Sequence, residues 1–201
     1  MLIRPALALL FGLMASIAAV AIAFAATSVD MGDFNATFDQ NKNMHLVASV
    51  TITAPPDKVF DAIAHPEITA KNDPQVDKVQ VVGHQGGSEI VELFGGQQVP
   101  IPNAPNSIKI KVTPDKANNS IEVDSYQSPI LQFQNSYKVS PTSDGKGSIV
   151  AYTSTSNDIS KQIQMEIPSD MRKTVGLQTF MMQMQRVAQF IDSNSGKVAT
   201  K

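Results

Sequence analysis

The stretch VTITAPPDKVFDAIAHPE, residues 50–67, decides the fold. It begins inside a run from His45 to Thr53 in which apolar and polar side chains alternate. This alternation predicts a β-strand with one drier face. Pro55 and Pro56 end the strand, because proline donates no backbone hydrogen bond and fixes its own φ angle.

A short helix is predicted directly after this break. Proline suits the first turn of a helix, and Pro56 stands at that position. Val59, Phe60 and Ile63 follow at helical spacing. The pair His65-Pro66 then stops the helix, since the residue before a proline avoids the helical region.

Downstream of this helix the chain predicts antiparallel strands. Gly86-Gly87 and the polar run 114–119 each join two β-rich segments, as in hairpins. The run 95–106 carries three prolines and is not a central strand. The predicted strands cover residues 76–82, 89–94, 108–112, 121–126, 131–139 and 148–156.

The longest helical pattern lies at the C-terminal end of the chain. It opens at Pro168-Ser169-Asp170 and ends near Asn194-Ser195-Gly196. One apolar stripe runs along it, formed by Leu177, Phe180, Met181, Met184, Val187, Ala188 and Ile191. Since the sheet must cover its dry face, we expect an α+β fold in which six to seven antiparallel strands wrap around this helix.

The N-terminal segment predicts export. Arg4 precedes an apolar run at residues 6–24 that ends in Ala23-Phe24-Ala25, the pattern of a signal peptide cleaved after Ala25. An uncleaved membrane anchor is the alternative, because the run is nearly long enough to span a bilayer. Either reading places the domain outside the cytoplasm, in a secreted, periplasmic or membrane-anchored form. We expect a flexible linker at 26–43, one domain at 44–194 and a disordered tail at 195–201.

Composition excludes several classes of function. Without residues 1–25 the chain holds 15 Lys and Arg against 18 Asp and Glu, a formal charge of −3, so nucleic acid is not expected as a partner. No cysteine is present, which excludes disulfides, thiolate metal sites and a cysteine nucleophile. The three histidines are not spaced as metal ligands, and we expect neither a metal nor a cofactor.

The run at residues 50–67, followed by the predicted strand at 76–82, resembles the opening of the SRPBCC superfamily. That group includes START lipid-transfer domains, polyketide cyclase/dehydrase-like proteins and pollen-allergen-like ligand binders. The resemblance extends over residues 46–192 and implies a helix-grip fold, in which an antiparallel sheet grips a long C-terminal helix around a deep apolar cavity. Such a cavity is a ligand site by default.

Nine residues are candidates for the lining of this cavity. Alternation points Asn135 and Tyr137 at the buried face, where polar groups need partners, and Ser125 lies in phase with Ile121 and Val123. These three either orient a ligand or bond to neighbouring groups. The apolar candidates are Phe60, Ile110, Phe133, Phe180, Met181 and Met184. Ordinary core packing is the alternative for the apolar set.

Three functions fit these expectations. The favoured one is an exported protein that binds a small hydrophobic or amphipathic, lipid-like molecule between the sheet and the C-terminal helix. Membrane contact is then expected through the N-terminal segment or the loop at 97–102. The second is a cyclase/dehydratase-like enzyme in which Tyr137, His65 or His84 is the acid or base. The third is a filled structural or interaction module of the cell envelope. No catalytic motif stands out, so we favour binding over catalysis.

Overall fold

The computed structural model describes residues 27–70, 76–95, 107–128, 131–158 and 166–195. Its main element is one antiparallel sheet of eight strands in the order β1-β2-β8-β7-β6-β5-β4-β3. The strands are β1 (Val29–Phe38), β2 (Met44–Ile52), β3 (Val76–Gln85), β4 (Ser88–Gly95), β5 (Ser107–Asp115), β6 (Ser120–Ser125), β7 (Phe133–Pro141) and β8 (Ser148–Ser156). The helices are α2 (Pro56–Ala64), α3 (Pro66–Thr69) and α4 (Ser169–Ser195).

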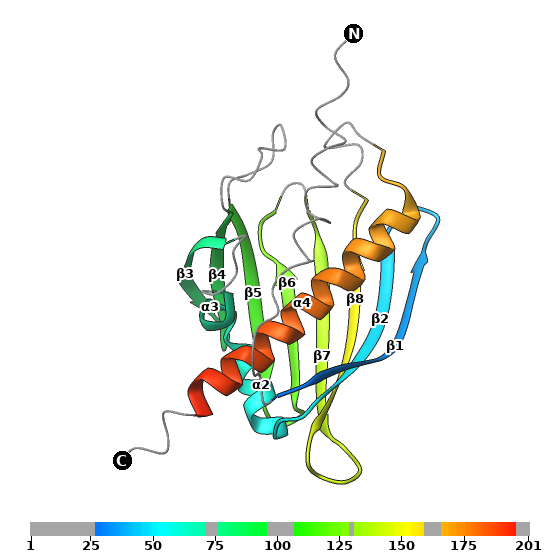
Figure 1. The fold of residues 1–201 in the computed structure, drawn as a ribbon. Helices are drawn as coiled ribbons and strands as arrows, with labels where there is room; N and C mark the ends of the chain where they lie inside the picture. The colour runs from blue at the N-terminus through cyan, green and yellow to red at the C-terminus, as the bar shows by residue number, and fades with distance from the viewer. Residues whose placement is uncertain (1–26, 71–75, 96–106, 129–130, 159–165, 196–201) are drawn as a thin grey trace.

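The sheet curves around α4, which crosses it diagonally (Figure 1). The helix packs against β1, β2, α2 and α3. Its predicted stripe forms the contact, because Phe180, Met184, Val187, Ala188 and Ile191 are all buried. The predicted helix-grip fold is confirmed.

Period-two patterning sets which face of the sheet each strand buries. In β2, Met44, Leu46, Ala48, Val50 and Ile52 are buried under the helices, while the residues between them are exposed or half-buried. Gly86 and Gly87 form the β3–β4 turn with positive φ angles of 55° and 83°. Glycine adopts such angles without a steric penalty, which is why this two-residue turn closes the hairpin.

The expected flexible linker at 26–43 is wrong, because β1 occupies Val29–Phe38 and pairs with β2 along its length. A shift of register between Met31 and Phe34 breaks the alternation within β1. Val29 lies partly buried on one side of this bulge, and Phe34 and Ala36 resume the inward positions on the other. A bulge reverses the period-two pattern, so the sequence reads as polar and irregular. This extra strand raises the count from six or seven to eight.

The chain before β1 is tied to the end of α4. Thr27 is buried, and its Oγ1 donates a hydrogen bond of 2.5 Å to Oδ1 of Asp192. The backbone N–H of Thr27 donates to the other oxygen of the same carboxylate at 3.3 Å. Residues 27–43 therefore belong to the folded domain, which was expected to begin only at residue 44. Helix α4 ends at Ser195. The rest of the expected tail at 195–201 lies outside the described residues, as does the expected contact loop at 97–102.

Candidate functional site

Two tyrosines occupy the centre of the sheet face that α4 covers. Tyr137 on β7 and Tyr152 on β8 are direct register partners, and their ring centroids lie 4.9 Å apart. The Tyr152 ring in turn stacks on Phe180 of α4, with centroids 4.5 Å apart and an angle of 9° between the planes. Aromatic contacts of this kind add stabilisation beyond the apolar area that they bury. The rings thus fix α4 against the sheet.

Both tyrosine hydroxyls are bonded inside the protein. The hydroxyl of Tyr137 donates to Oε1 of Gln183 at 2.9 Å, and that of Tyr152 donates to Oδ1 of Asn135 at 3.1 Å. Burial raises the pKa of Tyr137 well above its ordinary value of 10.0 and also raises the pKa of Tyr152. Both hydroxyls are therefore protonated at neutral pH and serve as hydrogen-bond donors rather than as bases.

Asn135 and Tyr137 face the helix side of the sheet, as their alternation predicts. Of the two readings left open for Tyr137, the structure supports bonding to a neighbouring side chain, Gln183. The sequence reasoning missed both partners. Tyr152 could have been found, because it lies in phase with the buried Ser148 and Val150 of β8. Gln183 carries no such signal, since it adjoins the apolar stripe of α4 without belonging to it.

The remaining candidate residues fall into two groups. Phe180 and Met184 are 1% and 0% exposed and belong to the packed core, together with Phe60 and Ile110. Met181 and Phe133 are only partly buried against this core, and Ser125 is half-buried. The structure thus brings the apolar candidates onto one face of the sheet, but it fills the middle of that face with side chains.

One part of the helix-side face is less covered. Val79, Leu93, Ile108 and Phe133 are only partly buried hydrophobic side chains packed against the core. Val79 pairs with Leu93, which pairs with Ile108, so they form a row across β3, β4 and β5. Ser125 joins this region to Phe133, whose backbone N–H donates to the Ser125 Oγ at 3.1 Å. We name these five residues, together with Asn135, the half-buried concave surface.

A pocket of about 570 Å³ lies beside this surface, at the end of the sheet where β6 and β7 are joined. Lys111, Asp124, Gln134 and Thr155 line it and are successive register partners across β5, β6, β7 and β8. They alternate with the buried residues and so lie on the face away from α4. The lining is completed by Asn43, Ser125, Tyr126, Gln127, Ser128, Gln132, Phe133 and Asn157. Only two of the nine candidates, Ser125 and Phe133, belong to it.

A second pocket, of about 220 Å³, adjoins the first. The two share Tyr126, Gln127 and Ser128, so this short segment after β6 separates them. Gln127 has a positive φ of 52°, which turns the chain sharply between the pockets. Ile108 of the half-buried concave surface also lines the smaller pocket.

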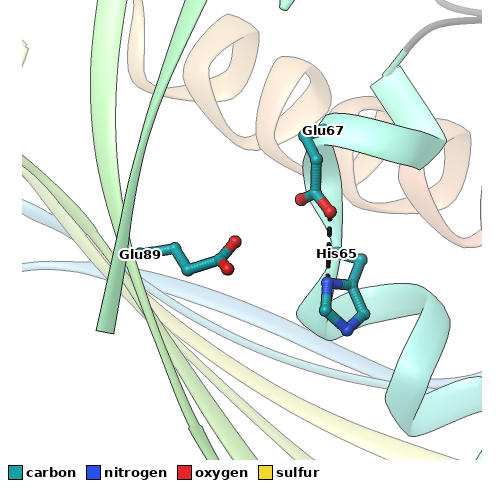
Figure 2. A group of neighbouring side chains, drawn as sticks. All are labelled: His65, Glu67 and Glu89. Carbon is teal, nitrogen blue, oxygen red and sulfur yellow. Dashed lines mark hydrogen bonds and ion pairs between the residues drawn. The ribbon is translucent and has the colours of Figure 1, made fainter. Parts of the chain in front are cut away.

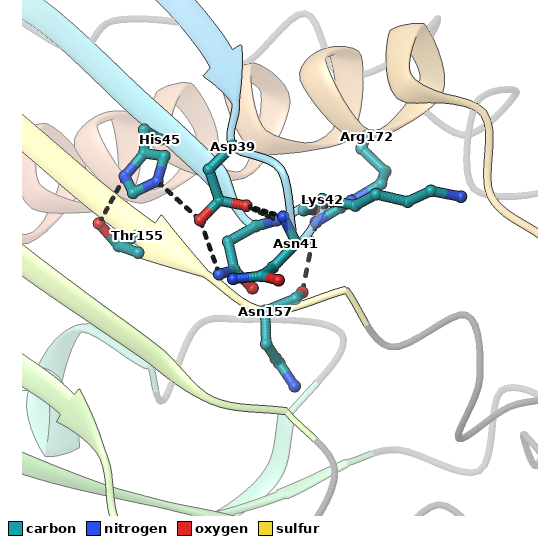
Figure 3. A network of polar contacts seen from close by, with 8 residues as sticks. Asp39, Asn41, Lys42, His45, Thr155, Asn157 and Arg172 are labelled. Atoms are coloured by element: carbon teal, nitrogen blue, oxygen red, sulfur yellow. Dashed lines mark hydrogen bonds and ion pairs between the residues drawn. The ribbon is translucent and has the colours of Figure 1, made fainter.

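Arg172, near the start of α4, binds backbone next to the larger pocket, whose lining includes Asn43 and Asn157. Figure 3 shows this network of contacts. The Nη1 of Arg172 donates to the backbone oxygen of Lys42 at 2.6 Å, and its Nη2 donates to that of Asn157 at 3.3 Å. Nη1 also lies 3.8 Å from Oδ1 of Asp158, and the guanidinium lies 5.0 Å from the centre of the Phe38 ring. One half-buried guanidinium therefore joins α4, the β1–β2 turn and the residues just after β8.

Asp39 shapes the β1–β2 turn that Arg172 contacts. Its Oδ1 accepts hydrogen bonds from the backbone N–H groups of Asn41 and Asn43, at 2.8 and 2.9 Å (Figure 3). The Asn43 side chain donates to the other oxygen at 2.9 Å. These bonds, that of the Asn43 side chain foremost, hold the pKa of Asp39 below its ordinary value. Hydrogen bonds within residues 39–43 thus define the shape of the turn.

Comparison with known proteins agrees with this architecture. A family model described as polyketide cyclase / dehydrase and lipid transport matches residues 44–175. The Zhui aromatase/cyclase of a Streptomyces species is a structural neighbour, with a TM-score of 0.54 and 17% identity over 77% of this chain and 94% of that one. TTHA0849 from Thermus thermophilus gives a TM-score of 0.53 and 16% identity over 75% of this chain and 99% of that one.

At these identities the two neighbours show a shared fold. No curated protein matches the sequence. The family match spans β2 to the first turns of α4 and so includes the two tyrosines, the half-buried concave surface and most of the pocket lining. The chain therefore belongs to the polyketide cyclase / dehydrase and lipid transport family.

Proposed function

We propose that this protein binds a small hydrophobic or amphipathic molecule outside the cytoplasm and holds it against the half-buried concave surface. The observation that carries the proposal is the row Val79, Leu93 and Ile108, whose side chains lie on the helix side of the sheet and are only partly buried. An apolar ligand that covered such a row would gain roughly 25 cal/mol for each Å² removed from water. Family membership supports the same kind of ligand.

The polar residues of this surface suit the head group of an amphipathic molecule. Ser125 and Asn135 stand among apolar neighbours, and a few placed polar groups in a mostly apolar site orient a ligand. The side-chain oxygen of Asn135 accepts a hydrogen bond from Tyr152. Its side-chain NH₂ group can in addition donate two hydrogen bonds. A carbonyl or carboxylate oxygen on the ligand matches these donors.

Binding fits the site better than catalysis with Tyr137 as a general base. A general base must be deprotonated at the operating pH before it can accept a proton from the substrate, whereas burial keeps the pKa of Tyr137 well above 10.0. Its hydroxyl is also engaged with Gln183. A cyclase/dehydratase-like activity through this tyrosine would first require that bond to break.

Native extraction followed by mass spectrometry tests the proposal directly. We expect purified protein to carry a lipid-like molecule, or to bind an anilinonaphthalene dye that fatty acids displace. Protein that carries no such molecule and takes up no dye would contradict the proposal. That outcome would favour the structural or interaction module instead.

A pair of variants localises the binding. Leu93→Glu places a charge within the half-buried concave surface, and we expect it to weaken dye binding at least about tenfold, because a carboxylate is costly beside an apolar ligand. Val47→Glu is the matched control, since Val47 is 54% exposed on the opposite face of β2. Phe133→Ala provides a second, uncharged test. Equal affinity in all three variants would place the ligand elsewhere.

Export through the N-terminal segment is part of the same proposal. We expect the intact mass of the protein from the periplasm or medium to correspond to a chain that begins at Ala26. Protein that retains its first 25 residues and sediments with membranes would support the anchored form. Protein found only in the cytoplasm would contradict export. Among the residues that the structure describes, no helix is long and apolar enough to cross a membrane.

A further inference from the structure

His65, Glu67 and Glu89 converge in a cluster outside the proposed binding surface (Figure 2). His65 follows α2, Glu67 lies in α3, and Glu89 lies near the start of β4. One ligand atom from each lies within 4.8 Å of those of the other two. The Nδ1 of His65 lies 3.1 Å from Oε1 of Glu67. In Figure 2 the carboxylate of Glu89 points toward this pair from the sheet.

The two carboxylates each direct one oxygen into the protein. Oε2 of Glu67 and Oε2 of Glu89 are buried, and neither accepts a hydrogen bond from any residue that the structure describes. Buried carboxylate oxygens are costly unless they are bonded, paired with a cation or coordinated to a metal. On the other side of Glu89, its Oε1 lies 3.9 Å from Nδ1 of His84. Each of the two neighbouring carboxylates thus has one oxygen near a histidine and one buried oxygen without a partner among the described residues, where a cation could bind.

We propose that His65, Glu67 and Glu89 bind a divalent transition-metal ion of the zinc class. One imidazole and two carboxylates form a donor set that suits zinc, whereas magnesium and calcium prefer oxygen ligands alone. Zinc lies about 2.0–2.2 Å from such nitrogen and oxygen atoms, so small rotations of the exposed His65 ring and of the Glu89 side chain bring the three ligands into range. Water completes the coordination.

Such an ion would join the α2–α3 corner to the sheet. His65 and Glu67 belong to the corner, while Glu89 belongs to β4 and pairs with the buried Val112 of β5. A ligand that binds only the folded state stabilises it in proportion to its affinity and concentration. The ion would therefore raise the thermal stability of this corner, and it needs no contribution from the proposed hydrophobic ligand.

Calorimetric titration of the purified, metal-stripped protein with zinc chloride tests the proposal. We expect one equivalent to bind with micromolar or tighter affinity and to raise Tm. Glu67→Gln, Glu89→Gln and His65→Gln should each weaken binding at least about tenfold, because each removes a ligand. Without zinc, Glu89→Gln should melt at the same temperature as the parent or higher, since it removes one of two facing charges.

Two controls match these variants. Glu92→Gln changes an acid on the same strand that accepts a hydrogen bond from Ser107 at 2.7 Å, and the amide oxygen of glutamine keeps that acceptor. His45→Gln changes a second histidine, whose Nε2 lies 3.6 Å from Oδ2 of another acidic residue, Asp39. Both controls should bind zinc within about twofold of the parent. No zinc binding, or binding that the three ligand variants leave unchanged, would overturn the proposal.

Discussion

Tyr137 is fully buried, and a buried phenol hydroxyl is costly unless it forms a hydrogen bond. Tyr137→Phe keeps the ring against Tyr152 and removes the bond to Gln183. It leaves the Gln183 oxygen without this donor, so we expect the free energy of unfolding to fall by about 1 kcal/mol. Urea denaturation measures the change. An unchanged midpoint would show that the bond contributes nothing net.

The same residue predicts alkaline instability. Burial raises the pKa of Tyr137 in the folded state above the value of 10.0 that it recovers on unfolding. Below pH 10 the Tyr137 hydroxyl is protonated in the folded and in the unfolded protein, so its contribution to stability is fully present. Above that pH the unfolded state ionises first and stability falls as pH rises. Denaturation at about pH 8 and about pH 11 should show a smaller loss for Tyr137→Phe than for the parent.

At the scale of elements, Arg172 joins three segments that are distant in sequence. Its side chain is 11% exposed, and it donates to backbone oxygens in the β1–β2 turn and after β8. Arg172→Ala should lower the free energy of unfolding by about 2 kcal/mol, because bonds to charged donors are among the stronger ones. Hydrogen exchange should quicken in the β1–β2 turn.

Lys173→Ala is the control for this prediction. Lys173 also stands over the Phe38 ring, at 5.8 Å, and it is the next residue in the same turn of α4. Its removal should change stability by less than about 0.5 kcal/mol. Equal losses in the two variants would mean that the ring contact, rather than the backbone bonds, holds the turn.

Elements with an unbroken period could be predicted from the sequence, and those with an interrupted one could not. β2, β8 and α4 keep a regular alternation or stripe, and their predicted ranges agree closely with the structure. In β1 the bulge after Met31 moves the inward-facing residues from odd to even positions, so the sequence of this strand has the irregular pattern of a linker. Local patterning contains no signal for such a shift, because pairing with β2 is what fixes it.

Across the whole molecule, the sequence predicts which face a residue occupies better than it predicts its partners. Asn135 and Tyr137 were placed on the correct face by alternation alone. Their partners Tyr152 and Gln183 come from other elements, as do the neighbours of His65. The sequence gives no sign that Glu89 lies near His65, because the fold, and not the chain order, brings the two residues together.

The two ends of the folded body are linked through Asp192, whose carboxylate accepts both bonds from Thr27. Asp192→Ala should leave the sheet intact but release residues 27 and 28, lowering the free energy of unfolding by about 1 kcal/mol. Limited proteolysis should then cut near residue 28 faster than in the parent. Cleavage at the parent's rate would indicate that β1 alone secures this segment.

In the sequence, only Ala25 and Ala26 separate the apolar run at residues 6–24 from Thr27, which makes that contact. Residue 27 is already fastened to the last turns of α4, and β1 begins two residues later. If the apolar segment remains in a bilayer, the domain is attached to the membrane by a very short connection. The C-terminal turns of α4 are then close to the lipid head groups. The contact between Thr27 and Asp192 would then limit how far the domain can rotate and move relative to the membrane.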